Sequence, residues 1–335
     1  MSRAQLTSTV EQNTGGAVAP YVAGKNKVIN GDFGIWQRGT SFSVSTSVIF
    51  TADRFYTLCG AGTASRQTFT PGTAPVAGYE NQYYWNQVIT ANSQNYEFGQ
   101  RVENARTFAG QTTTLSFWAR SSVGAQTMNI EPIQQFGTGG SPSSPVGSGG
   151  STWTPNSSWQ RFSFTFVMPS VAGKTFGTNN DSYIQLKLGQ YTTTATNTSI
   201  DIWGVQWESG PVATPFTTAT GTLSGELAAC QRYYYRNTAT DAFSGLASAV
   251  APSTSVWQSQ IPLPLQFRTK ASAVEYGGTY KLNDGTNTIS AATVTLGAGA
   301  QSSFYATING AATGLTQWRP YQLFTDGYIA FSAEL

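Results

Sequence analysis

Apolar and polar residues alternate along much of this chain, and this alternation constrains the fold more than any other feature of the sequence. Residues 161–167 place phenylalanines on one face of an extended segment and polar residues on the other. The same alternation occurs at residues 96–103, 114–120 and 183–188. Because successive side chains of a strand point to opposite faces, a period of two predicts β-strands that bury one face. Residues 199–207 are apolar on both faces, as expected of a central strand.

Clusters of Gly, Pro, Ser and Asn separate these segments, and such clusters are typical of turns between antiparallel strands. The longest cluster, residues 137–152, is predicted to be a loop within a sheet domain. Asn283–Gly285 predicts a tight hairpin, because Asn, Asp and Gly tolerate the positive φ that such turns require. We therefore predict an all-β protein with an N-terminal extended arm, an antiparallel jelly-roll β-sandwich and a second, smaller C-terminal β-sandwich.

Composition divides the chain into three parts. Residues 1–25 have almost no large apolar side chains, so we predict a docking arm pinned on a neighbouring surface, with a disordered leader as the alternative. Residues 208–227 contain two prolines and several glycines, which indicates a domain boundary. The jelly roll then spans residues 26–218, and the C-terminal β-sandwich spans residues 219–335. Within the latter, residues 225–236 can begin as a helical turn and continue as a strand.

The composition also excludes several classes of function. The sequence contains no histidine, which excludes Ser-His-Asp and Cys-His catalysis and every imidazole metal site. Charged residues make up 10% of the chain and the net charge is +2, which gives no electrostatic basis for binding nucleic acid. Cys59 and Cys230 lie in different predicted domains, so each is expected to be a buried free thiol. We expect no signal peptide and no membrane insertion, so that release from a cytoplasm would require lysis.

The carboxylates form no recognisable catalytic pair. A glycosidase needs two carboxyl groups about 5–9 Å apart. Glu97 and Glu103 share one face of a predicted strand, but six strand positions span roughly 20 Å, so they cannot act together. The sequence also lacks a Gly-rich phosphate loop and a nucleophile elbow. We expect no enzyme activity, and a polysaccharide depolymerase that uses carboxylates from distant segments is the alternative left open.

Two aspartates are candidate metal ligands. Asp32 lies in the opening loop and Asp201 on the predicted central strand, and the first and last strands of a jelly roll are often neighbours. Both supply hard oxygen ligands, so together they are candidates for holding a structural calcium ion. In the alternative interpretation, Asp32 caps its own Asn-Gly-Asp turn and Asp201 is an edge carboxylate. No other cofactor is expected.

Two tryptophans are candidate ligand-binding residues. Most of the nine tryptophans are expected in the core, because an indole buries a large area. Trp153 and Trp159 differ because they flank the Gly/Ser/Pro loop, among Thr, Asn, Ser and Gln residues. A tryptophan in such a loop can stack on a sugar ring while neighbouring amides bond the sugar hydroxyls. The alternative is that each ring belongs to the core or anchors the loop.

Six segments in a fixed order carry a resemblance to a known group of proteins. They are NKVINGDFGIWQRGTSF, TADRFY, LSFWARSS, SSWQRFSFTFVMP, IWGVQWESGPVATPF and GELAACQRYYYR, between residues 26 and 236. Together they resemble virion proteins of tailed bacteriophages, namely tail fibre, minor tail and head fibre proteins. Each motif alone is loose, whereas their ordered combination is fairly specific to the group.

The resemblance implies a jelly roll similar to a carbohydrate-binding module and a structural or adhesive role in a virion. It implies attachment to other virion proteins through residues 1–25, a homotrimer, and contact of the C-terminal domain with a glycan or protein of the host surface. We expect a tail fibre or receptor-binding protein that is assembled in the host cytoplasm and released by lysis. A head fibre or capsid decoration protein is the alternative. No sugar-contacting residue is carried over from the group.

Overall fold

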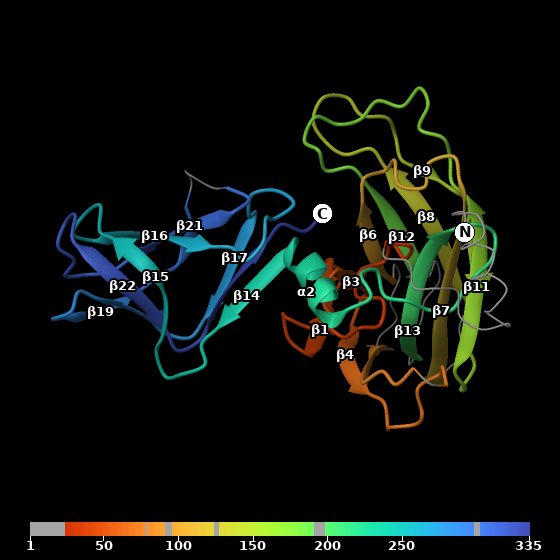
Figure 1. The fold of residues 1–335 in the computed structure, drawn as a ribbon, viewed down its shortest axis with the longest axis horizontal. Coiled ribbons are helices and arrows are strands. Elements are labelled where there is room, and N and C mark those ends of the chain that lie inside the picture. The colour runs from red at the N-terminus through yellow and green to blue at the C-terminus, as the bar shows by residue number, and fades with distance from the viewer. Residues whose placement is uncertain (1–23, 78, 91–95, 124–126, 191–197, 298–301) are drawn as a thin grey trace, which may run out of the picture. The chain divides into compact units, whose positions relative to one another are not determined.

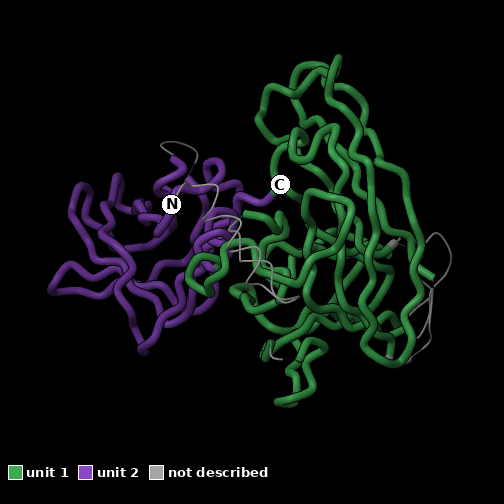
Figure 2. The backbone as a smooth tube through the Cα atoms, turned by 45° about the vertical axis from the view of Figure 1, so that its right-hand side comes forward, with its two compact units in different colours: residues 1–226, 335 green, residues 227–334 purple. Residues whose placement is uncertain are grey.

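The computed structural model describes residues 24–77, 79–90, 96–123, 127–190, 198–297 and 302–335. These residues form β-strands together with one helix (Figure 1), which confirms the all-β class. The chain divides into two compact units, Met1–Glu226 with Leu335 and Leu227–Glu334 (Figure 2). Nearly all of the predicted docking arm, residues 1–25, lies outside the described residues. Within them, no helix has the length and apolar character needed to span a bilayer.

The first unit contains two antiparallel sheets. Its first sheet has the strand order β1 (Ser41–Val44), β4 (Gly62–Thr68), β5 (Tyr83–Ile89), β13 (Thr198–Ser209), β7 (Thr112–Val123) and β11 (Gln160–Val167). Its second sheet has the order β10 (Ser151–Trp153), β8 (Met128–Gln135), β12 (Tyr183–Gln190), β6 (Glu97–Glu103), β3 (Phe55–Leu58) and β2 (Ile49–Phe50), with β9 (Val146–Gly147) beside β8.

The core of the first unit is built from the apolar positions that the period-two alternation predicts. Phe98 and Val102 of β6 are buried in one cluster with Leu115 and Phe117 of β7. β6 belongs to the second sheet and β7 to the first, so the cluster receives side chains from both sheets. Face-to-face packing of two sheets around such a layer defines a β-sandwich. The predicted sandwich is therefore confirmed.

The opening segment of the first unit is bonded to its last strand, β13. Asn26 is 1% exposed and uses its whole side-chain amide. Its Oδ1 accepts hydrogen bonds from the backbone N–H of Val28 (2.9 Å) and Trp207 (3.0 Å). Its Nδ2 donates to the carbonyls of Val205 (3.1 Å) and Thr217 (3.0 Å). One side chain therefore joins the start of the unit to β13 and to the segment that follows it.

Asn30 organises the turn that follows. Its φ is 61°, a left-handed conformation that asparagine tolerates better than most residues. Its Nδ2 donates to the carbonyls of Ile35 (2.9 Å) and Asp53 (3.0 Å), and its Oδ1 accepts from the N–H of Ile35 (2.9 Å). This turn directs its large apolar side chains into the core: Phe33, Ile35 and Trp36.

The predicted loop at residues 137–152 and the predicted boundary segment after β13 both contain ordered structure. The predicted loop at residues 137–152 includes β9 and the first residues of β10, which extend the second sheet. Residues 208–222 are packed on the first unit, because Glu208 accepts hydrogen bonds from the N–H (2.9 Å) and hydroxyl (2.8 Å) of Thr214. Phe216 is buried against Trp203. The prolines of this segment therefore lie in ordered extended chain that packs within the first unit.

The division between the units falls at Glu226, beyond the expected position at residue 218. The carboxylate of Glu226 accepts hydrogen bonds from the backbone N–H of Asn30 (2.7 Å) and Thr220 (2.6 Å). Glu226 lies in helix α2 (Leu223–Gln231). Its two hydrogen bonds hold the first turn of the helix to the first unit, which explains the later boundary.

The second unit contains two further antiparallel sheets, here called the small sheet and the large sheet. The small sheet has the order β14 (Tyr234–Thr238), β23 (Tyr328–Ser332) and β17 (Ala273–Gly277). The large sheet has the order β19 (Thr288–Ala291), β18 (Tyr280–Asn283), β22 (Pro320–Thr325), β15 (Ser244–Val250), β16 (Val256–Pro262), β21 (Tyr305–Ala311) and β20 (Thr295–Leu296).

The core of the second unit receives residues from both of its sheets, including Trp257 and Leu323 of the large sheet and Phe331 of the small sheet. The predicted hairpin joins β18 to β19, and Gly285 has a φ of 89°. The predicted helical turn followed by a strand is confirmed by α2 and β14. Both cysteines are free and buried, as expected.

The variant Asn26→Ala is expected to lower the free energy of unfolding by about 2–4 kcal/mol, because it leaves buried backbone groups without their partners. Urea unfolding of the full chain measures this loss. Asn179→Ala is the matched control, since Asn179 is exposed and donates to a single side chain, Thr138. An equal loss in both variants would show that Asn26 does not hold the opening segment to β13.

Candidate functional site

Part of the outer face of the first sheet is covered by the chain itself. Trp203 of β13 is fully buried although it lies outside the main core of the unit. It packs with Trp118 of β7, with Phe69, which follows β4, and with Phe216 of the segment after β13. The ring centroids of Trp203 and Phe216 are 5.0 Å apart. At this cluster the sheet therefore presents no bare surface to a ligand.

The outer face of the second sheet carries a polar network that is already satisfied. Glu97 Oε1 accepts hydrogen bonds from the hydroxyl of Tyr56 and the Nε2 of Gln185, both at 2.6 Å. Its Oε2 lies 3.1 Å from Lys187 Nζ. Burial, and then the charge of Glu97, raises the pKa of Tyr56 well above its usual value. These groups bind one another, so they are poorly placed to bind a ligand.

Trp153 lies in the core of the first unit. It is 3% exposed, its Nε1 donates to the carbonyl of Leu188 (2.8 Å), and its ring contacts Phe117 and Phe162. A sugar needs an open ring face, so this placement corrects the prediction that Trp153 contacts a ligand.

Trp159 is only half-buried and lies at the edge of the aromatic cluster on the first sheet. Its ring contacts Phe69 and Tyr84, with centroids 5.6 Å and 5.4 Å away. The guanidinium of Arg120 lies 5.0 Å from its centroid. A ligand contact at Trp159 stays a prediction, and the structure brings Trp159 and Trp153 to different clusters.

Asp201 is already neutralised by its neighbours. Its Oδ2 accepts a hydrogen bond from Arg120 Nε (2.7 Å), and its Oδ1 accepts one from Asn86 Nδ2 (2.6 Å). A guanidinium on one oxygen and an amide on the other leave little room for a calcium ion. The described residues contain no group of three acidic or thiol side chains that could hold a metal ion. The geometry at Asp201 therefore does not suit the predicted calcium ligand.

Asp32 lies beside Glu226 rather than beside Asp201. It lines a cavity of about 120 Å³ together with Tyr79, Glu226 and the residues that begin α2. Burial raises the pKa of Asp32 to about 6, and the nearby charge of Glu226 adds to this rise. The N–H of Gly34 donates to its Oδ1 (3.3 Å) and opposes the rise. Asp32 thus caps its own turn, as the alternative interpretation held.

The large sheet of the second unit presents a row of polar side chains. Thr288 on β19 pairs with Asn283 on β18, which pairs with Gln322 on β22. Gln322 pairs in turn with Ser248 on β15. Adjacent strands lie ~4.8 Å apart, so the row crosses about 14 Å of the sheet. The neighbours of these residues along their strands are buried in the core: Leu282, Leu323 and Ala249. The row therefore faces away from the core.

Three hollows follow this row, and together we call them the trough. The first, of about 270 Å³, is lined by Phe243, Lys281, Asn283, Thr288 and Phe324. The second, of about 370 Å³, shares Asn283 with the first and Ser248 with the third. The third, of about 430 Å³, extends onto β16. Shared lining residues make the hollows continuous across five strands.

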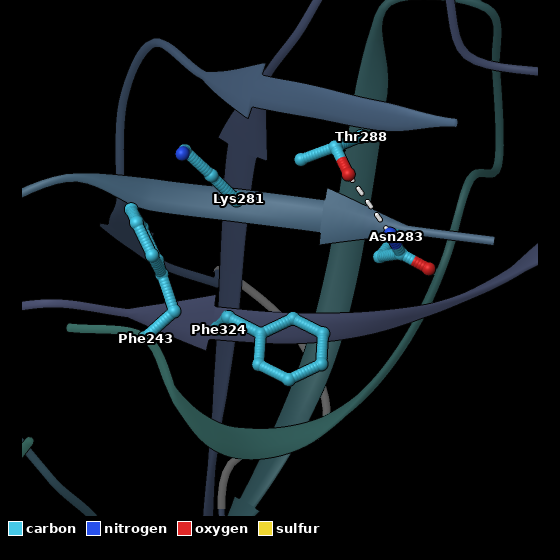
Figure 3. A pocket seen from close by; sticks show the side chains of 5 residues that line it. All are labelled: Phe243, Lys281, Asn283, Thr288 and Phe324. Atoms are coloured by element: carbon cyan, nitrogen blue, oxygen red, sulfur yellow. Dashed lines mark hydrogen bonds between the residues drawn. The ribbon is translucent and has the colours of Figure 1, made fainter. Parts of the chain in front are cut away.

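The side chains of the trough are mostly uncharged and have free hydrogen-bonding capacity. Within the described part of the chain, the amides of Gln258, Gln260 and Gln322 make no hydrogen bond, in contrast to the buried amides of Asn26 and Asn30. Aromatic rings lie at one end of the trough, where Phe243 and Phe324 flank the first hollow (Figure 3). Free amides and hydroxyls beside aromatic rings are the groups that bind sugars and other polar ligands.

Sequence reasoning did not identify these residues. Asn283, Gln322 and Ser248 are far apart in the sequence and become neighbours only through strand register. Trp318 lies near the second hollow in the chain, two positions before Pro320. Its side chain is 69% exposed and its φ is 63°. An exposed tryptophan held in a turn is unusual, but exposure cannot be read from the sequence.

No protein-family model matches this chain, and neither does any curated protein. Among solved structures it is similar to a family 11 carbohydrate-binding module from Clostridium thermocellum, in complex with a β-1,3-1,4-mixed-linked tetrasaccharide. That match has 9% identity and a TM-score of 0.31, and it covers 52% of this chain and 98% of the module.

Two other similar structures are a putative sugar binding protein from Bacteroides thetaiotaomicron and the enzymatically active domain of tailspike protein 4 of bacteriophage CBA120. The first has 10% identity and a TM-score of 0.33, covering 55% of this chain and all of the other. The second has 14% identity and a TM-score of 0.31, covering 56% of this chain and 22% of the tailspike chain.

The variant Asp32→Asn is expected to stabilise the protein near neutral pH. The raised pKa, about 6 against 3.8, means that the folded state holds the proton more tightly than the unfolded state. Stability therefore falls as the pH rises between these two values, and Asn, which cannot ionise, avoids this loss. At about pH 7.5 the variant should be more stable by up to about 3 kcal/mol, and near pH 4 the gain should be small.

Urea unfolding at the two pH values measures this effect. Asp241→Asn is the control, because Asp241 is exposed. A gain for Asp32→Asn that is the same at both pH values would mean that the proton of Asp32 is not its cause.

Proposed function

We propose that this chain is a non-enzymatic adhesive protein of a bacteriophage particle, and that the trough binds a glycan of the host surface. The observation that carries the proposal is the row Thr288, Asn283, Gln322 and Ser248, with hollows along its length. An extended polymer can lie across the strands and meet a hydrogen-bonding side chain on each of them.

The state of the polar groups favours the trough over the faces of the first unit. A glycan presents many hydroxyls, and a protein binds it with free amides, hydroxyls and a few aromatic rings. Glu97 and its partners on the first unit would have to break existing hydrogen bonds to bind sugar. Gln258, Gln260 and Gln322 in the trough would not. Binding there replaces hydrogen bonds to water without unpairing any group of the protein.

The virion part of the proposal is supported by the ordered motif series between residues 26 and 236. In this proposal residues 1–25 attach the chain to other virion proteins, and three copies form the functional fibre. Sedimentation equilibrium of the purified chain tests the trimer, and a monomer at every concentration would contradict it. A non-enzymatic role predicts that host polysaccharide incubated with the protein keeps its chain length.

The variant Ser248→Trp is expected to weaken glycan binding by at least about tenfold, because Ser248 lines both the second and the third hollow and an indole would fill them. Binding is measured with the full chain on an array of bacterial surface polysaccharides. Thr313→Trp is the matched control, because Thr313 is exposed and does not line any of the three hollows. Unchanged binding by Ser248→Trp would remove the trough from the proposal.

The position of the protein in the particle separates a tail fibre from a head fibre or decoration protein. Immunogold labelling of intact particles with an antibody against this chain is expected to mark the tail. Labelling of the capsid alone would favour the head fibre or decoration protein instead. Such a result would leave the glycan-binding trough to be tested by the array.

A further inference from the structure

The first hollow differs from the rest of the trough because it contains a cation. Lys281 of β18 lines it, and its Nζ lies 3.7 Å from the centroid of the Phe243 ring (Figure 3). Within the described part of the chain, Lys281 has no carboxylate partner. The ammonium group is therefore held against an aromatic ring at the wall of a hollow, and no carboxylate of the described residues neutralises its charge.

The nearest carboxylate of the trough does not offset this charge. Asp284 lines the second hollow, where its Oδ2 lies 3.1 Å from Arg319 Nε. Its Oδ1 accepts hydrogen bonds from the N–H of Thr286 (2.9 Å) and Asn287 (2.7 Å). These donors lower the pKa of Asp284, so it stays ionised and bound to its own neighbours. The charge available to a ligand in the first hollow is thus the positive charge of Lys281.

The other polar side chains of the first hollow, those of Asn283 and Thr288, can still donate hydrogen bonds to a ligand. Asn283 Nδ2 donates one hydrogen to Thr288 Oγ1 (2.9 Å), as the dashed line in Figure 3 shows, and keeps its second hydrogen. Asn283 Oδ1 already accepts from the N–H of Gly285 (2.7 Å). Thr288 accepts through its oxygen and can donate its own hydrogen. An ammonium, a hydroxyl and an amide N–H therefore remain for a ligand that brings acceptors.

We propose that the first hollow binds an anionic sugar unit, one that carries a carboxylate or a phosphate, within the glycan that occupies the trough. This inference rests on the proposed function and names the substrate class of the same site. The anionic group accepts hydrogen bonds from Lys281, Asn283 and Thr288, and charge-assisted hydrogen bonds of this kind are among the stronger ones. The apolar face of the sugar packs on Phe243 or Phe324, whose rings flank the hollow in Figure 3.

The test uses the full chain on an array of matched oligosaccharides, each in a neutral, a carboxylated and a phosphorylated form. The wild-type protein is expected to bind at least one anionic form about tenfold more tightly than the neutral form. Raising the salt concentration from about 0.05 M to about 0.5 M should reduce this preference, because the hollow is open to solvent. The form that is preferred identifies the anionic group.

Two variants locate the preference. Lys281→Met is expected to bind the neutral and anionic forms equally, because it removes the cation of the first hollow. Lys270→Met removes an exposed lysine of the same unit that does not line the first hollow, and it should keep the preference. The double variant with Phe243→Ala and Phe324→Ala should weaken binding of all three forms, because it removes both rings on which the sugar can pack.

The outcomes separate this inference from the proposed function. Equal binding of neutral and anionic forms by the wild type would overturn the inference and leave glycan binding intact. A preference that survives in Lys281→Met, or that is lost equally in Lys270→Met, would also overturn it. Absence of binding to every glycan would contradict the proposed function itself and the inference with it.

Discussion

Two buried asparagines, Asn26 and Asn30, join the opening segment of the first unit to the rest of that unit. The positions of the surrounding segments depend on the hydrogen bonds of these two residues. Asn26 joins the opening segment to β13 at Val205 and Trp207, more than 170 residues away. Asn30 shapes the turn that sends Phe33 into the core, and its N–H binds Glu226. A chain with only 10% charged residues has few ion pairs to use, so buried amides provide the specific long-range contacts.

The two units treat their polar groups in opposite ways. In the first unit, buried amides and carboxylates bind one another, as at Glu97, and aromatic side chains cover the face that carries Trp203. In the second unit, the polar face of the large sheet keeps amides such as Gln322 free above hollows. Binding a polar ligand costs little free energy only where the polar groups of the protein are not already hydrogen-bonded to one another. This contrast supports the proposal that the ligand binds to the second unit.

Several features could be predicted from the sequence because they depend on local pattern. Alternation located β6, β7, β11 and β12, and Asn283–Gly285 located the hairpin of β18 and β19. Other predictions failed where distant contacts decided the outcome. Trp153 follows a loop rich in Gly, Ser and Pro, but its ring is buried in the core. There its Nε1 donates a hydrogen bond to the carbonyl of Leu188. Asp201 accepts a hydrogen bond from Arg120, because the register of β13 with β7 places these two residues opposite each other. Neither contact can be predicted from the residues that lie next to Trp153 or Asp201 in the sequence.

The sequence by itself determined that this chain forms antiparallel sandwiches without imidazole chemistry, because side-chain periodicity and the absence of histidine are local facts. Only the tertiary structure decided which polar side chains are used by the protein and which remain available. An amide is free or engaged according to partners that come from remote strands. For that reason the trough, with Lys281, Asn283 and Thr288 at its end, could not be predicted from the sequence. It depends on the register that places β18 beside β19 and β22.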